Sequence, residues 1–150
     1  MELAKYDGDI IAWANQQAEF IRNKQFDLLD LENIAEEILD VGKSEFRELR
    51  NRLAVLIGHL LKYKYQPERR GNSWRRTISN QRKELCRELQ KMPSLRKNFD
   101  DEIWWNNTYD QAVSLFAKET NLDENLLPEV CEWNIYKIKN KNKKHFPRDF

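Results

Sequence analysis

Little in this sequence breaks the chain into short segments or cross-links it. Its 150 residues include only four glycines, four prolines and two cysteines. Glycine and proline are the strongest local breakers of regular structure, so their scarcity favours long helices. A chain of this length can bury a core large enough to fold without a disulfide or a structural metal.

Motifs for metal binding, nucleotide binding and nucleophilic catalysis are missing as well. The cysteines and histidines (Cys86, Cys131, His59 and His145) do not have metal-ligand spacing. The glycines are scattered, whereas a phosphate-cradling loop gathers several of them before a helix. There is no nucleophile elbow. We therefore predict no metal and no cofactor, and the sequence leans away from an enzyme.

Long apolar runs and a strong net charge are also absent. The longest apolar run is too short to span a bilayer, and the charged start, Met1 to Lys5, lacks the apolar segment of a secretory signal. The net charge of +1 gives no global attraction to nucleic acid or membrane. Two widely separated cysteines suit a reducing compartment. We expect a cytoplasmic protein without membrane contact.

The strongest apolar stretch lies in the middle of the chain. Side chains recur there at spacings of three and four, which is one helical face: Phe46, Leu49, Leu53, Leu56, Leu60 and Tyr63. Val55, Ile57 and Leu61 lie on other faces, and a helix that is apolar nearly all round is usually buried on several sides. We predict an all-α compact bundle of about five to seven helices around a buried central helix from about Ser44 to Tyr65.

Local signals place the other helices. Asp7 or Asp9 can cap a first helix that ends near Asn23. Asp30 can cap a second helix that stops at Gly42, since the residue after a helix often takes the left-handed conformation. Later helices are predicted over residues 73–92, 94–119 (as one helix or two) and 129–138. Residues 1–138 are predicted to form a single domain, and residues 139–150 a loosely ordered basic tail.

Charge is segregated along the chain. Between Asp27 and Glu48 there are eight acidic residues against two basic ones, and between Lys62 and Lys83 eight basic residues against one acidic. The simpler interpretation is that these segments pair with each other or form solvated faces. The functional one is a rim that binds phosphates through arginine and stacks bases on aromatic rings. Its candidate binding residues are Lys62, Tyr65, Gln66, Arg69, Arg70, Trp74, Arg75 and Arg76.

His59 is the only histidine in a segment predicted to fold. A hydrolase or nuclease could be centred on it, with Glu37 and Arg82 brought close by folding. The simpler interpretation is a hydrogen-bonded core histidine. The sequence does not decide between the two, so these three residues are weak catalytic candidates.

Several motifs occur in one order along the chain: Tyr6-Asp7-x-Asp9 with Trp13 and Gln17, Phe26-x-x-Leu29-Asp30 with Asn33 and Glu36-Glu37-Ile38, Gly42-Lys43-Ser44-Glu45, His59-Leu60-Leu61-Lys62, Gln66-Pro67, Ser73-Trp74 and Pro93-Ser94-Leu95. This combination resembles the bacterial domain-of-unknown-function 29 family from about Tyr6 to Trp133. The chain departs from the family where Cys131-Glu132-Trp133 lacks an expected proline and where Lys24 replaces a usual glycine. The resemblance implies a compact all-helical bacterial domain and no catalytic residues.

Three functions remain open. The first is a protein-interaction or regulatory module, which requires an exposed apolar patch of several hundred Å². The second is a nucleic-acid-binding module that uses Lys62 to Lys83, which requires its arginines on one surface and free of acidic partners. The third is the hydrolase or nuclease centred on His59. We expect a protein partner, with nucleic acid as the alternative.

Overall fold

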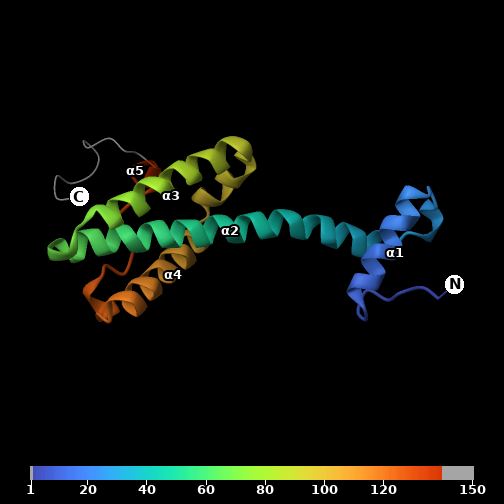
Figure 1. The fold of residues 1–150 in the computed structure, drawn as a ribbon, viewed down its shortest axis with the longest axis horizontal. Helices are drawn as coiled ribbons and strands as arrows, with labels where there is room; N and C mark the ends of the chain where they lie inside the picture. Colours follow the sequence, from blue (N-terminus) through green and yellow to red (C-terminus); the bar gives the residue numbers. More distant parts are fainter. Residues whose placement is uncertain (1, 140–150) are drawn as a thin grey trace. The chain divides into compact units, whose positions relative to one another are not determined.

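A computed structural model describes residues 2–139 of the chain, which form helices joined by short loops (Figure 1). There is no strand in this part of the chain. The α-helices are α1 (Ile10–Arg22), α2 (Leu31–Tyr65), α3 (Asn72–Lys91), α4 (Glu102–Thr120) and α5 (Ile135–Lys139). Short 3-10 helices lie between them: η1 (Phe26–Leu28), η2 (Pro67–Arg69), η3 (Pro93–Asp100) and η4 (Glu124–Leu126). The prediction of an all-α bundle is confirmed.

Contacts divide the chain into two compact units, unit 1 over residues 1–44 and unit 2 over residues 45–150. Helix α2 contributes its first turns to unit 1 and the remainder to unit 2. The single domain over residues 1–138 stays a prediction. The predicted basic tail lies outside the described residues, apart from Lys139 at the end of α5.

The predicted helix stop at Gly42 and restart at Ser44 are wrong. Helix α2 continues through both residues (Figure 1). None of the glycines in the described residues has a positive φ angle, so Gly42 does not take the left-handed conformation of a helix stop. An internal glycine costs a helix only about 1 kcal/mol. Ending the helix there would leave several backbone carbonyls without partners, so continuing it is the better outcome.

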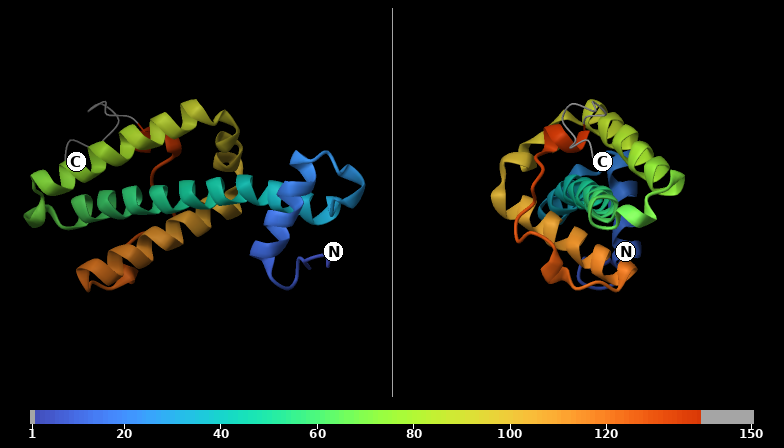
Figure 2. Two further views of the ribbon diagram at one scale, coloured as in Figure 1. Left: turned by 45° about the vertical axis from the view of Figure 1, so that its right-hand side comes forward. Right: turned by 90° about the vertical axis from the view of Figure 1, so that its left-hand side faces the viewer.

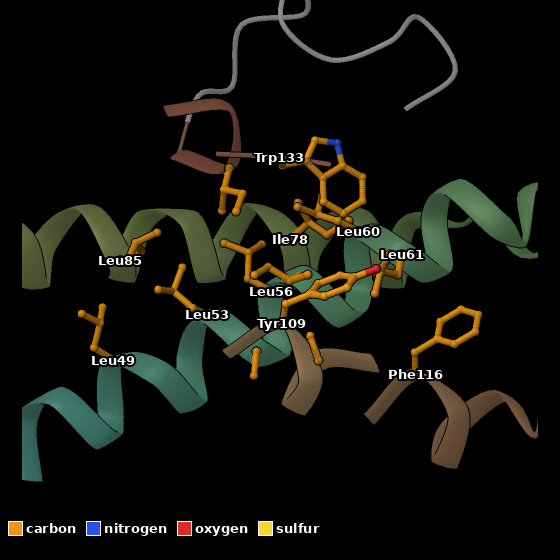
Figure 3. Close-up of a cluster of buried hydrophobic side chains, with 14 of the residues drawn as sticks. Leu49, Leu53, Leu56, Leu60, Leu61, Ile78, Leu85, Tyr109, Phe116 and Trp133 are labelled. Atoms are coloured by element: carbon orange, nitrogen blue, oxygen red, sulfur yellow. The ribbon is translucent and has the colours of Figure 1, made fainter. Parts of the chain in front are cut away.

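Unit 2 packs around the second half of α2, which is buried as predicted. Its core leucines, including Leu49, Leu53, Leu56 and Leu60, are at most 1% exposed (Figure 3). Helices α3 and α4 run beside this part of α2 on different sides (Figures 1 and 2). The neighbouring elements complete the core with Ile78, Leu85, Leu89, Tyr109, Ala112, Phe116, Trp133 and Ile138.

Unit 1 is built from α1, η1 and the first turns of α2. Helix α1 begins after Asp9, whose Oδ1 accepts a hydrogen bond from the backbone N–H of Ala12 at 3.0 Å. It then runs across the start of α2 (Figure 2). Three of its side chains are buried, Trp13, Gln17 and Phe20.

Substituting Gly42 with alanine tests the continuity of α2. A Cβ atom at this position meets no heavy atom within 4 Å, so Gly42→Ala should raise the free energy of unfolding by up to about 1 kcal/mol. Urea unfolding followed by circular dichroism measures the change. Asn121→Ala is the control, because Asn121 ends α4 with a φ of 57° and alanine there is strained. A loss of stability in Gly42→Ala similar to that in Asn121→Ala would mean that the helix stops at Gly42.

Candidate functional site

The carboxylate of Asp30 joins the two helices of unit 1. Its Oδ2 accepts hydrogen bonds from Trp13 Nε1 on α1 at 3.0 Å and from Asn33 Nδ2 on α2 at 2.8 Å. The backbone N–H of Asp30 donates to Gln17 Oε1 at 2.8 Å. The bond from Asn33 is the main cause that lowers the pKa of Asp30, and the bond from Trp13 adds to it. The folded unit therefore stabilises the ionised form.

Tyr6 attaches the segment before α1 to the same place. Its hydroxyl donates to Glu37 Oε1 at 2.7 Å, and its ring meets the Trp13 ring edge-on with centroids 4.9 Å apart. The bond to Glu37 is the largest of the causes that raise the pKa of Tyr6 to about 12. The residues of these contacts form what we call the polar seam: Tyr6, Trp13, Gln17, Asp30, Asn33 and Glu37.

The polar seam runs between the elements of unit 1, with Trp13 and Gln17 buried, and many large apolar side chains of this unit are exposed. Thirteen large hydrophobic residues of the described chain are exposed, and nine of them belong to unit 1, with exposed fractions from 46% to 72%. These nine are Leu3, Ile10, Ile11, Ile21, Phe26, Leu31, Ile38, Leu39 and Val41. We call them the unit 1 apolar surface. Their concentration in less than a third of the chain marks unit 1 as the candidate site.

The part of this surface on α2 has helical order. Residues three, four and seven apart share a face of an α-helix, so Leu31, Ala35 and Ile38 form one line, with Leu39 on one flank and Val41 on the other. We define the α2 stripe as Leu31, Ala35, Ile38, Leu39 and Val41, all of which are exposed. A helix face of this kind normally packs against another element.

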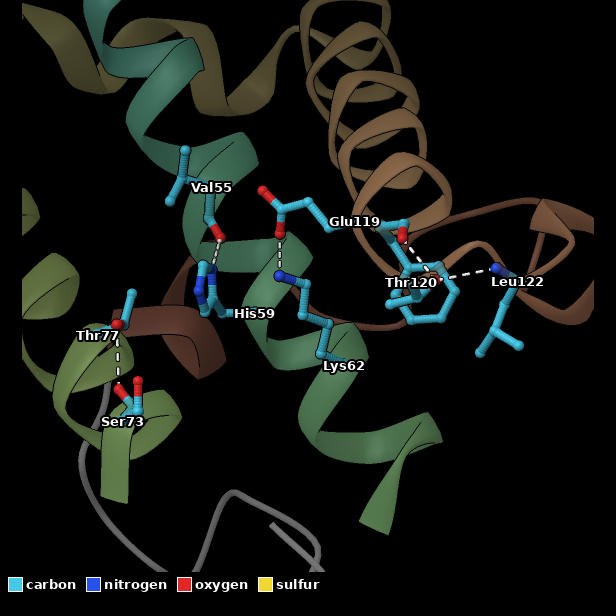
Figure 4. A network of polar contacts seen from close by, with 9 residues as sticks. Val55, His59, Lys62, Ser73, Thr77, Glu119, Thr120 and Leu122 are labelled. Carbon is cyan, nitrogen blue, oxygen red and sulfur yellow. Dashed lines mark hydrogen bonds and ion pairs between the residues drawn. The ribbon is translucent and has the colours of Figure 1, made fainter. Parts of the chain in front are cut away.

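The basic segment of unit 2 is largely engaged within the fold. Lys62 is only 8% exposed and forms an ion pair with Glu119 of α4 (Figure 4). Lys64 forms an ion pair with Glu132, whose Oε1 also accepts a hydrogen bond from Tyr65 at 2.9 Å. Burial, followed by this bond, raises the pKa of Tyr65 to about 12. The acidic partners thus come from α4 and from the segment before α5.

Two arginines, Arg70 just before α3 and Arg75 in its first turns, contact the end of α2. Arg70 Nε donates to the carbonyl of Tyr63 at 2.6 Å, and its guanidinium lies 4.6 Å from the centroid of the Tyr63 ring. Arg75 Nε donates to the Tyr63 hydroxyl at 3.2 Å. Trp74 packs against the core as a half-buried side chain. The remaining candidates are Gln66, which is buried, and Arg69 and Arg76, which are exposed.

The three catalytic candidates have separate structural contacts. His59 Nδ1 lies 2.9 Å from the carbonyl of Val55, one turn earlier in α2 (Figure 4). Arg82 Nε donates to the carbonyl of Ile138 at 2.8 Å, and burial lowers the pKa of Arg82 to about 10. Glu37 belongs to unit 1, where it accepts the bond from Tyr6. A catalytic role for these residues stays a prediction.

Unit 2 also contains a cavity of about 730 Å³ beside α5. Aromatic side chains line it, among them Phe99, Trp105 and Trp133, together with Cys131. Burial is the main reason why the pKa of Cys131 is raised to about 11. Because the thiolate is the nucleophile, this cysteine is a poor candidate for covalent catalysis at neutral pH.

Two further features of the described residues bear on the site. No three or more histidine, cysteine, aspartate or glutamate side chains between residues 2 and 139 come together as a metal site. No helix in this range is both long enough and apolar enough to cross a bilayer.

Substituting Asp30 with alanine tests the polar seam through its pH dependence. The folded pKa of Asp30 is lowered, so its contribution to stability is present above the unfolded pKa of about 3.9 and disappears as the pH falls through the folded pKa. Asp30→Ala should therefore speed hydrogen exchange of the α1 amides at pH 7, relative to wild type at the same pH. The difference should shrink near pH 3. Asp27→Ala, which removes an exposed carboxylate from η1, is the control and should change little. An Asp30→Ala effect equal at both pH values would contradict the role of the ionised carboxylate.

Comparison with known proteins supplies the family. No curated protein and no solved structure matches the chain. The family model described as "Domain of unknown function DUF29" matches residues 5–142. That range contains the whole polar seam and every helix described between residues 2 and 139, and it confirms the resemblance that the motifs carry. The chain therefore belongs to the DUF29 family.

Proposed function

We propose that the protein is an interaction module that binds another protein through the unit 1 apolar surface. The observation that carries this proposal is the exposure of nine large hydrophobic side chains on a unit of 44 residues. Monomeric proteins rarely expose apolar patches larger than a few hundred Å², and larger patches usually mark interaction sites. The polar seam supports the proposal further, because it holds unit 1 together without burying these side chains.

The charge of unit 1 favours a different protein over a second copy of this chain. Unit 1 carries ten acidic residues against four basic ones. In a two-fold dimer the same surface faces itself, so the acidic residues beside the apolar surface would oppose each other. Like charges brought together at an interface cost several kcal/mol. A partner of another sequence avoids that repulsion.

The alternatives draw less support from the described residues. A nucleic-acid site needs basic side chains that are free to meet phosphates. Lys62, Arg70 and Arg75 instead contact Glu119 and Tyr63. For a hydrolase, the described contact of His59 is to the backbone carbonyl of Val55, which is the bond of an ordinary structural histidine.

Aspartate substitutions on the α2 stripe test the proposal. Ile38 and Leu31 are 67% and 66% exposed, so Leu31→Asp/Ile38→Asp should leave the fold intact. Proteins captured by the wild-type chain would be purified, and their dissociation constants measured by calorimetry. Loss of interface anchors should weaken binding by about tenfold or more. Leu126→Asp is the matched control, because Leu126 is a 60% exposed leucine of unit 2.

Three outcomes would contradict this proposal. The purified partners could bind the double variant as tightly as the wild type, or lose as much affinity with Leu126→Asp. The chain could also capture only itself. Sedimentation of the wild type and the double variant at several concentrations detects that case. The wild type would then form a dimer, and the double variant would not.

The nucleic-acid alternative has its own test. Labelled duplex DNA, single-stranded DNA and RNA would be titrated with the protein at 50 and 200 mM salt and read by fluorescence anisotropy. We expect no binding that depends on Arg69 and Arg76, two exposed arginines of the basic segment. Binding that falls by about a thousandfold between the two salt concentrations, and is lost in Arg69→Ala/Arg76→Ala, would establish the nucleic-acid function instead.

A further inference from the structure

We infer that the partner presents a basic amphipathic helix, which lies along the α2 stripe. This inference rests on the proposed function and specifies the chemistry of the partner at the same surface. It follows from the shape of the stripe and from the charge at its edge.

The stripe has the dimensions of a helix-binding face. Leu31 to Gly42 spans about three turns, or roughly 17 Å at 1.5 Å per residue. Helix α2 has no break over this distance. Its apolar positions are spaced as in helix pairs, in which side chains of one helix enter spaces on the other. Such a face suits an amphipathic helix with apolar anchors at matching spacing.

Small residues alternate with large ones along this face. Ala35 lies between Leu31 and Ile38, and Gly42 follows one turn later. A Cβ atom added at Gly42 would meet no heavy atom within 4 Å, so there is room above it. The spaces above Ala35 and Gly42 can receive the large side chains of a partner helix.

The edge of the stripe carries the charge. Glu32 and Glu36 are exposed beside Leu39, which follows them by seven and three residues along the helix. Nearby carboxylates already have partners, since Asp40 lies 3.6 Å from Lys43 Nζ and Glu37 accepts the bond from Tyr6. Lysine or arginine side chains of a partner helix can pair with Glu32 and Glu36 across the contact. An acidic helix or an anionic membrane surface would be repelled.

Synthetic peptides test this inference with the full chain. The probe is an 18-residue Leu/Lys peptide with leucine at the helical positions that face α2. Its matched controls are a Leu/Glu peptide of the same pattern and a scrambled Leu/Lys peptide. Fluorescence anisotropy gives their dissociation constants. We expect the patterned basic peptide to bind at least about tenfold more tightly than either control.

Charge reversal on the protein tests the basic character of the partner helix separately from the apolar surface that binds it. Glu32→Lys/Glu36→Lys should weaken binding of the basic peptide by about tenfold, and the variant should bind the Leu/Glu peptide more tightly than the basic one. Glu102→Lys/Glu124→Lys reverses two exposed carboxylates outside unit 1 and should have no such effect. Leu31→Asp/Ile38→Asp should abolish binding of every peptide.

Each result has a defined meaning. In one case, Glu32→Lys/Glu36→Lys changes the affinity for the basic peptide no more than Glu102→Lys/Glu124→Lys does, while Leu31→Asp/Ile38→Asp still abolishes binding. The apolar surface then binds helices, but the inference of a basic partner is wrong. If neither change on α2 affects binding, both the inference and the proposed surface are wrong. Binding to phosphatidylserine vesicles that is lost in Leu31→Asp/Ile38→Asp would replace the protein partner with a lipid surface.

Discussion

Unit 1 depends on one ionised side chain, the carboxylate of Asp30. It accepts hydrogen bonds from an indole on α1 and from an amide on α2, while its own backbone N–H binds Gln17 of α1. A carboxylate that accepts several N–H groups is stabilised in its charged form. Hydrogen bonds therefore fix α1 to α2, together with the buried rings of Trp13 and Phe20. This is why the apolar residues of both helices can lie on the outside of unit 1, where they are available to a partner.

Unit 2 follows the opposite principle. The leucine side chains in its half of α2 are buried. Charged side chains form ion pairs that join elements of this unit. Lys62 and Lys64 pair with Glu119 and Glu132, which stand 57 and 68 residues away in sequence. The segment with the most basic residues therefore helps to position α2, α4 and the segment before α5. The surface available to a partner belongs to the acidic unit, where most of the exposed large apolar residues lie.

The sequence predicts what local chemistry decides. The start of α1 after Asp9 and the end of α2 before Pro67 follow from capping and from the geometry of proline. The inward face of α1 does not follow from local chemistry, because that helix has apolar residues on two sides. Ile10 and Ile21 are 46% and 47% exposed, whereas Phe20 is buried. The bond from Trp13 to Asp30 orients α1, and its two residues are 17 apart in sequence. The motifs do contain this information, since every residue of the polar seam is among those that carry the family resemblance.

Covalent footprinting of the purified protein tests the central claim most directly, because α2 contains its own control. A carbene reagent labels exposed side chains, and mass spectrometry locates the label along the helix. We expect strong labelling at Leu31, Ile38 and Leu39, and protection at Leu49, Leu53 and Leu56, in dilute protein that sedimentation shows to be monomeric. Equal protection of both groups in the monomer would mean that the chain covers its own apolar surface, and would contradict a surface held open for a partner.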